Sequence, residues 1–321
     1  MSAMHCWVCG EHAEFDRLEV RDSDRGVDEY CLMLCSACSS GGLEHPPPPE
    51  ALGRHYDASY YGGSDSKFAA PLQSIVNLST RMRARSIWRS LNRAPAPLVL
   101  DIGCGRGSLV AELARLGARG IGLERAALGS FPGHANLELR VGELSEQRFR
   151  AASFDGVVLW HAFEHLGNPR AVLAEVGRIM KPGGLLVIAV PNNASWQARF
   201  FGRCWFHLDV PRHLHFFGHT GLLLLLRQQG YEAQASSTFD PIQNLFAFVQ
   251  SCLNSLPGSA PNRFYQLMRG EQAPIGILKM LLWMLPAFLL LPFALVEAGY
   301  SAARGDGACS IIFASKKQRT D

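Results

Sequence analysis

The chain has 321 residues, of which 48% are hydrophobic, and a formal net charge of +3. This length suits one large domain with a small accessory one, and the apolar content is enough for a sizeable core. The small net charge excludes a nucleic acid as the expected main partner. No basic stretch leads into an apolar run at the N-terminus, so we expect a cytoplasmic protein whose thiols stay reduced.

Two cysteine pairs mark residues 1–45 as a separate small segment. Cys6 and Cys9 form one C-x-x-C turn, and Cys35 and Cys38 form a second. Four thiolates in two such turns complete a tetrahedral site for Zn²⁺, and metal binding would supply the folding energy that so small a core lacks. We therefore predict a zinc-ribbon-like segment with structural zinc, with a redox pair or chance spacing as the alternative. Spare ligands are Cys31, His5 and His12.

Residues 46–94 are expected to form a linker and a helix. Four prolines at 46–49 favour a stiff extended spacer. Hydrophobic residues then recur at helical intervals over residues 67–92, and Pro95 and Pro97 end the pattern. The large domain is predicted to follow over residues 95–321.

Short buried strands alternate with helices after residue 95. The helices are predicted over residues 108–116, 171–180 and 220–229. Such alternation is typical of an α/β fold with a Rossmann-like, doubly wound sheet, here of seven strands. The predicted strands cover residues 98–101, 120–124, 137–141, 154–160, 185–190, 231–239 and 308–315.

A glycine-rich turn leaves the first of these strands. Gly103, Gly105 and Gly107 follow Asp101, and a helix opens directly after them. Glycine lets the backbone turn tightly and approach a ligand closely, and the helix N-terminus favours an anionic group such as a carboxylate. The dinucleotide pattern would place its third glycine at Ser108. A carboxylate at Asp101 would repel a pyrophosphate but suits the ammonium of an amino acid.

Acidic residues also follow the next two strands. Glu124 ends the second strand, where a carboxylate can accept hydrogen bonds from ribose hydroxyls. Glu143 follows the third strand and can receive an adenine amino group. Each acid alone would more often be a solvated strand-end residue, but together with the glycine turn they favour a nucleoside-type cofactor.

These motifs as a set resemble the class I methyltransferases that use S-adenosylmethionine (SAM). Residues 99–107 resemble their first motif, and residues 154–158 with 163–166 resemble their fourth-strand motif. Residues 173–184 resemble the helix and turn that follow. The stretch 209–217 resembles the branch that includes the ubiquinone-biosynthesis O-methyltransferases, so the resemblance covers residues 95 to 240.

The resemblance implies SAM contacts at Asp101, Gly103, Gly105, Glu124 and Glu143, the last standing where the family more usually has Asp. We also assign three neighbouring residues of the same loop and of the fourth strand's end to the cofactor site, namely Cys104, Gly107 and Trp160.

Methyl transfer from a sulfonium is a direct displacement, so alignment and exclusion of water matter most. An oxygen or nitrogen acceptor also needs a base of near-neutral pKa, for which histidine is suited. The candidates are His161 and His165 after the fourth strand and His213 after the fifth, with His215 beside it.

If residues 160–166 are helical, His161, Glu164 and His165 share one face that can hold a second divalent cation or simply fix the loop. Candidates for lining an acceptor pocket are Trp196, Trp205 and Phe206, although aromatic residues at such positions more often serve in packing.

An insertion at residues 241–305 separates the last two predicted strands. Its second half, residues 276–300, approaches the apolarity of a membrane span, although Pro286 and Pro292 interrupt it. The final strand must return to the same sheet, so a buried helix pair or a helix lying in a membrane interface fits better than a span. A hydrophobic cap on the domain is the equal alternative.

We therefore predict a SAM-dependent methyltransferase of a small-molecule, sugar or lipid-linked acceptor, with peripheral membrane contact through residues 276–300 as an option. A non-catalytic SAM-binding interaction protein is the second hypothesis. A nicotinamide-dependent oxidoreductase is the third, and the glycine spacing together with Asp101 counts against it.

Overall fold

The structure is a computed structural model that describes residues 4–23, 28–56, 70–91, 95–126, 133, 135–268 and 277–316. The start of the helix predicted from residue 67, and residues 269–276 of the predicted insertion, lie outside these ranges. The chain forms two compact units, each built from three segments of sequence. The sheet unit comprises residues 70–190, 225–236 and 311–321, and the ribbon unit comprises residues 1–69, 191–224 and 237–310.

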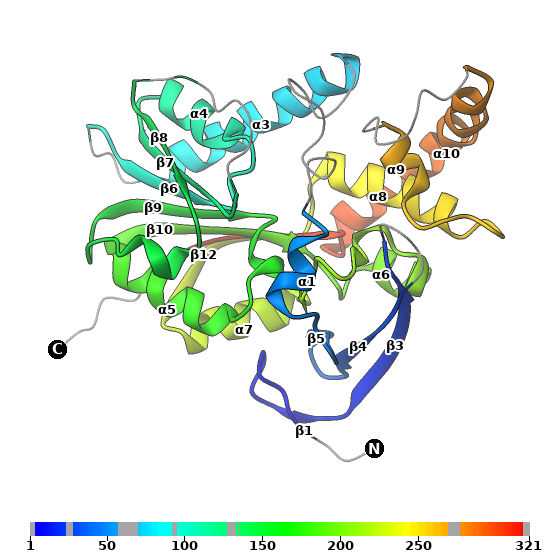
Figure 1. The fold of residues 1–321 in the computed structure, drawn as a ribbon, viewed down its shortest axis with the longest axis horizontal. Helices are drawn as coiled ribbons and strands as arrows, with labels where there is room; N and C mark the ends of the chain where they lie inside the picture. The colour runs from blue at the N-terminus through cyan, green and yellow to red at the C-terminus, as the bar shows by residue number, and fades with distance from the viewer. Residues whose placement is uncertain are drawn as a thin grey trace. The chain divides into compact units, whose positions relative to one another are not determined.

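A seven-stranded sheet forms the centre of the sheet unit (Figure 1). Its strand order is β12-β13-β10-β9-β6-β7-β8, and the neighbours from β10 to β8 pair in parallel. The first three strands along the chain run from β6 to β8 at one edge of the sheet, and the chain then returns so that β9 pairs on the other side of β6, as in doubly wound folds. The strands are β6 (Leu98–Ile102), β7 (Arg119–Glu124), β8 (Leu137–Val141), β9 (Phe154–Trp160), β10 (Met180–Pro191), β12 (Tyr231–Ser237) and β13 (Cys309–Lys316).

Helices cover both faces of this sheet (Figure 1). Helices α3 (Ala70–Ser90) and α4 (Ser108–Arg115) lie on one face, and α5 (Pro169–Ile179) lies on the other. The core under α3 and α4 consists of aliphatic side chains from helices and strands, because parallel strands covered on both faces are apolar throughout. Its buried members are Ala84, Ile87, Leu91, Val99, Leu113, Ala118, Val158, Leu185 and Val187.

Two local details differ from the sequence-based expectation. Residues 181–184 belong to β10, whose pairing with β9 shifts register between Met180 and Leu185, rather than forming a separate turn. The stretch after β9 is not a continuous helix but a single short 3₁₀ turn, Phe163–His165 (η2). His161 has a φ of +51°, outside the right-handed helical region, and this conformation interrupts the helix that the i, i+3 spacing suggested.

The ribbon unit contains two small antiparallel sheets. Strands β1 (Met4–His5) and β2 (His12–Ala13) form a hairpin around the first cysteine pair. The second sheet has the order β11-β5-β4-β3. It combines β3 (Phe15–Arg21), β4 (Glu29–Cys35) and β5 (Gly41–Leu43) with β11 (His215–Phe216), which comes from far along the chain.

Helices make up the remainder of the ribbon unit. Helix α7 (His219–Gln228) begins in this unit and ends in the sheet unit. Short 3₁₀ turns are η3 (Gly202–Cys204) and η4 (Phe206–Leu208), and η1 (Leu144–Gln147) follows β8 in the sheet unit. The other helices are α1 (Pro49–Gly53), α6 (Trp196–Phe201), α8 (Pro241–Asn254), α9 (Arg263–Met268) and α10 (Ile277–Arg304).

Helix α10 contains both interrupting prolines, Pro286 and Pro292, so the apolar insertion ends in one long helix rather than a helix pair. It packs on α8 and α9 through Ala294, which is buried together with Val249, Leu253 and Phe264. Within the described residues, the stretch Trp283–Arg304 has the length and apolar composition of a membrane-crossing helix. Only 22% of its most apolar window is buried, which distinguishes it from an ordinary core helix.

Candidate functional site

The glycine turn after β6 adopts the conformation that its sequence requires. Gly103, Gly105 and Gly107 have φ values of +71°, +53° and +73°, in the left-handed region that favours glycine. A Cβ added to Gly103 would lie 2.5 Å from the Cβ of Ala162, so the turn also passes too close to its neighbour for a side chain. The turn ends at Gly107, the N-cap of α4. Backbone N–H groups at this helix start can therefore face a ligand.

One carboxylate and one backbone carbonyl support the glycine turn. Glu124, at the end of β7, accepts hydrogen bonds from the Gly105 N–H at 2.7 Å and from the Arg125 N–H at 2.9 Å. The N–H groups of Gly103 and Cys104 donate to the carbonyl of Leu123 at 2.8 and 3.1 Å. The turn is thus held against the end of β7 by backbone and side-chain contacts, a role of Glu124 that sequence reasoning missed because it depends on strand pairing.

The carboxyl of Asp101 is 2% exposed at the end of β6. Burial, with a smaller contribution from the negative charge of Glu124, raises the pKa of Asp101 to about 8. Burial also raises the pKa of the Cys104 thiol, with smaller contributions from the negative charges of Asp101 and Glu124. A positively charged ligand group beside the buried Asp101 side chain would favour its ionised form. Asp101, at the end of β6, is therefore suited to bind a cation.

Glu143 lies one residue beyond Gly142 at the end of β8. Its side chain caps the 3₁₀ turn η1, and its N–H donates to Glu146 Oε2 at 2.8 Å. Its carboxylate also accepts from Arg125 Nε at 2.9 Å and is 47% exposed. Glu143 therefore stands at the same edge of the sheet as Asp101 and Glu124, although in a more solvated position.

The end of β9 carries a second group of predicted site residues. Trp160 packs against the core cluster under α3, with the Arg83 guanidinium 4.8 Å from its ring centre. His161 donates its backbone N–H to the carbonyl of Ala189 at 2.8 Å, and its Nδ1 lies 3.4 Å from Glu164 Oε1. Glu164 is 1% exposed, whereas the His161 side chain is 21% exposed. A buried carboxylate beside a partly exposed imidazole is an arrangement that can orient a base.

His213 belongs to the ribbon unit, whereas His161 and His165 belong to the sheet unit. Its Nδ1 lies 2.9 Å from the carbonyl of His207, and its Nε2 lies 3.8 Å from Asp209 Oδ2. Asp209 also pairs with Arg212, which is 5% exposed. Nearby, Trp205 and His207 are buried, so the stretch 205–213 is a packed polar and aromatic loop.

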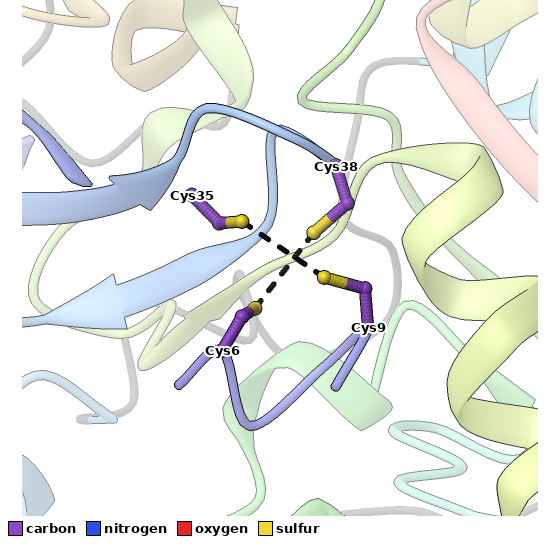
Figure 2. Close-up of side chains that lie close together, drawn as sticks. All are labelled: Cys6, Cys9, Cys35 and Cys38. Carbon is purple, nitrogen blue, oxygen red and sulfur yellow. Dashed lines mark hydrogen bonds between the residues drawn. The ribbon is translucent and has the colours of Figure 1, made fainter. Parts of the chain in front are cut away.

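The four N-terminal cysteines converge on one point (Figure 2). The Sγ atoms of Cys6 and Cys38 lie 3.9 Å apart, as do those of Cys9 and Cys35, and all four are buried and reduced. Sulfurs bound at about 2.3 Å to a tetrahedral zinc lie about 3.8 Å from one another. The spacing therefore matches a zinc site, while the spare candidates Cys31, His5 and His12 stand outside this group of four.

Comparison with known proteins places this geometry in a family. A family profile described as "Methyltransferase domain" matches residues 79–236. An Ubiquinone biosynthesis O-methyltransferase from Dinoroseobacter shibae is 31% identical over 183 residues, which cover 51% of this chain and 73% of the relative. The enzyme of the same name from Maricaulis maris is 30% identical, with coverage of 46% and 65%.

The same enzyme from Nitrosococcus oceani is 38% identical over 102 residues, which cover 29% of this chain. The chain spans 43% of that relative's length, less than two thirds. Among solved structures, the [4+2]-cyclase SpnF has a TM-score of 0.54 and 16% identity, with coverage of 86% of this chain and 98% of that one. This likeness concerns the fold alone.

A putative sarcosine dimethylglycine methyltransferase from Galdieria sulphuraria has a TM-score of 0.51 and 14% identity, with coverage of 83% and 98%. The predicted Rossmann-like methyltransferase fold, with its seven-stranded sheet, is thus confirmed. The chain belongs to the class I SAM-dependent methyltransferases, in the family of the ubiquinone biosynthesis O-methyltransferases.

Proposed function

We propose that this protein transfers the methyl group of SAM to an oxygen atom of a small acceptor molecule. The observation that carries the proposal is the buried carboxyl of Asp101 beside a left-handed glycine turn that opens α4. This pair suits an amino acid, because the carboxyl faces an ammonium and the helix N-terminus faces a carboxylate. The relatives' name, which specifies O-methyl transfer, supports oxygen as the acceptor atom.

The cofactor would be held by residues at the carboxyl ends of three adjacent strands. Asp101 and the turn from Gly103 to Gly107 would bind the amino-acid end of SAM. Glu124 would accept from the ribose hydroxyls, and Glu143 would accept from the adenine amino group. Bound SAM supplies an electrophilic methyl group, and the protein aligns it with the acceptor and excludes water.

His161 is the candidate base that the local geometry supports best. The Glu164 carboxylate is buried 3.4 Å from His161 Nδ1 and can orient the imidazole, leaving the other ring nitrogen to accept a proton from a hydroxyl. His165 and His213 are further candidates. A second divalent cation held by His161 and Glu164 is the alternative way to activate the hydroxyl.

Calorimetric titration with S-adenosylhomocysteine tests the cofactor assignment. Wild type should bind, and Asp101→Ala should bind at least tenfold more weakly. Transfer of tritiated methyl from SAM into a lysate, followed by fractionation of the label, would identify the acceptor. Binding without transfer on any acceptor would favour a non-catalytic SAM-binding protein, and no binding would overturn the proposal.

We propose that the tetracysteine site holds structural zinc. Four buried thiols with Sγ separations of 3.9 Å across the site suit tetrahedral coordination and leave no open position for catalysis. Elemental analysis should find about one zinc per chain, and Cys6→Ser with Cys38→Ser should remove it. Cys252→Ser, a cysteine outside the group, is the matched control.

We propose that α10 contacts a membrane and that the acceptor is apolar or lipid-linked. The outward side of α10 carries Phe288, Phe293 and Val296, which are 71%, 64% and 74% exposed. Residues 283–295 include no charged side chain, and Tyr300, which is 49% exposed, stands near the C-terminal end of α10, as aromatic residues do in helices at membrane interfaces.

Flotation with phosphatidylcholine vesicles tests this contact. The triple variant Phe288→Ser, Phe293→Ser, Val296→Ser should lose vesicle binding, while Phe200→Ser, which changes a 66% exposed phenylalanine on α6, should keep it. Equal binding by both variants would contradict the membrane contact without affecting the cofactor assignment.

A further inference from the structure

We propose that metal at the tetracysteine site positions the segment over residues 192–221, so that metal occupancy sets the geometry of the residues that follow β10. This proposal rests on the proposed zinc site and methyltransferase function. The segment leaves the carboxyl end of β10, the side of an open α/β sheet where ligands bind, and it contains the candidate base His213. The cysteine-containing residues 1–45 therefore do not form an independent module but fold together with this segment.

The second cysteine turn is hydrogen-bonded directly to the segment. Ser40 is fully buried, and its Oγ accepts from the Gly218 N–H at 2.8 Å while it donates to the Cys38 carbonyl at 3.2 Å. Asn193 Nδ2 donates to the Ser39 carbonyl at 2.9 Å. Cys38 to Ser40 thus hold both ends of the segment, and a metal bound to Cys38 would fix the conformation of this backbone.

Two glycines allow this close approach. A Cβ added to Gly218 would overlap the Cys38 carbonyl oxygen, and one added to Gly221 would overlap Ser40 Oγ and lie 3.2 Å from Cys38 Sγ. Neither glycine has a positive φ, so the requirement is for space beside the cysteine turn rather than for backbone freedom. Any side chain at these positions would push the segment away from the metal site.

The segment also supplies strand β11 to the four-stranded sheet of the ribbon unit. His215 and Phe216 of β11 pair with Gly42 and Gly41 of β5, which follows the second cysteine turn. The Leu43 N–H donates to the Leu214 carbonyl at 3.2 Å. This pairing begins immediately after His213, so it limits the positions that His213 can take.

The first cysteine turn contacts the same strand from another side. Trp7, between Cys6 and Cys9, places its ring edge-on to His215 and Phe217, with centroid distances of 5.0 and 6.1 Å. Both cysteine turns therefore contact residues 214–221, and bound metal would link the two turns covalently to each other. Metal removal would leave four buried thiols whose turns are free to separate.

Hydrogen–deuterium exchange on the full-length protein tests this coupling. We compare zinc-loaded protein with protein stripped by a chelator, and follow peptides covering residues 205–222 and 98–126. Stripping should raise exchange in 205–222 by at least about tenfold, as expected for loss of a cooperative unit, and leave 98–126 nearly unchanged. Affinity for S-adenosylhomocysteine should stay within about twofold, because its binding residues lie in the sheet unit.

Variants that leave the four thiols intact provide a second test by hydrogen–deuterium exchange. Gly218→Ala with zinc bound should raise exchange in 205–222, and Ser40→Ala should do so more weakly. Gly299→Ala is the matched control, because an added Cβ there meets nothing within 4 Å. Unchanged exchange over 205–222 after metal removal and in Gly218→Ala would overturn the proposal. Absence of S-adenosylhomocysteine binding would instead contradict the methyltransferase function, so the two failures are distinguishable.

Discussion

At the scale of single residues, the proposed cofactor site depends on one buried carboxyl and one left-handed glycine turn. Asp101 is held at the end of β6 with a pKa raised to about 8 by burial and by Glu124. The folded protein therefore keeps a proton on Asp101 at neutral pH that the unfolded chain would release. Protonation of Asp101 therefore contributes to the free energy of unfolding. This contribution is fully present below the ordinary aspartate pKa and is lost as pH rises through about 8.

The raised pKa predicts that cofactor affinity depends on pH. An ammonium ligand needs the ionised carboxyl, so affinity for S-adenosylhomocysteine should rise by up to about tenfold per pH unit between pH 6 and pH 8. Calorimetry across this range measures it. Asp101→Asn should flatten the dependence, and 5′-methylthioadenosine, which lacks the amino acid, should show no such rise with wild type. A flat profile for both ligands would contradict the role of Asp101.

The glycine turn gives a second prediction at this scale. Gly103→Ala combines a positive φ with a Cβ 2.5 Å from that of Ala162. It should lower the free energy of unfolding by about 1–3 kcal/mol and weaken binding of S-adenosylhomocysteine. Urea denaturation and titration measure the two effects. Gly53→Ala, in α1 with nothing within 4 Å of the added Cβ, should leave both nearly unchanged.

At the scale of elements, α10 is polar on part of its buried side and apolar outside. Glu297 is 7% exposed, and it accepts from Gln197 Nε2 at 2.8 Å and from Ser301 Oγ at 2.5 Å. Burial raises the pKa of Glu297, while the two hydrogen bonds oppose that rise. Gln197 lies on α6, so its hydrogen bond to Glu297 links α10 to α6. Gln197 also donates to the carbonyl of Asn244 on α8 at 3.0 Å, which adds α8 to the network.

Substitution of Glu297 should separate its hydrogen bonds from its charge. Glu297→Ala leaves buried donors of Gln197 and Ser301 without their acceptor and should cost about 1–3 kcal/mol of unfolding free energy. Glu297→Gln keeps an acceptor and should cost clearly less. Because the folded pKa is raised, wild-type stability should fall relative to Glu297→Gln as pH rises above the ordinary glutamate pKa. Equal losses in both variants would show that the hydrogen bonds contribute little.

Local pattern predicted the elements unevenly. The amphipathic and apolar repeats predicted α4, α5 and the strands β6 to β10 well, because each follows from the spacing of its own residues. The stretch from Trp160 to Leu166 was not a continuous helix, because His161 takes a positive φ. The apolar second half of the insertion forms one helix rather than a helix pair, since α10 continues through Pro286 and Pro292.

At the scale of the whole molecule, the two proposed ligands would bind different units. The residues proposed to bind the cofactor lie in the sheet unit, and the tetracysteine site proposed to bind zinc lies in the ribbon unit. A ligand that binds only the folded state stabilises it by about 2.7 kcal/mol at a hundred times its dissociation constant. S-adenosylhomocysteine and the metal should therefore each stabilise the folded chain by binding at separate sites.

Thermal denaturation of the full chain tests this separation. A chelator should lower the melting temperature, and S-adenosylhomocysteine should raise it in both zinc-loaded and stripped protein. Lowering the pH should release the metal, because protons compete with it for the thiolates. If S-adenosylhomocysteine no longer stabilised the stripped protein, the two sites would be coupled rather than separate.

The sequence by itself determined the fold class, the glycine turn with Asp101, and the two cysteine pairs. Each of these features depends on a pattern of residues that lie close together along the chain. Only the tertiary structure decided that Glu124 supports the turn at Gly105 and that the cysteine turns hold residues 214–221. Ser40 and Gly218 stand 178 positions apart. Their contact follows from packing and strand addition, for which no local periodicity gives a signal.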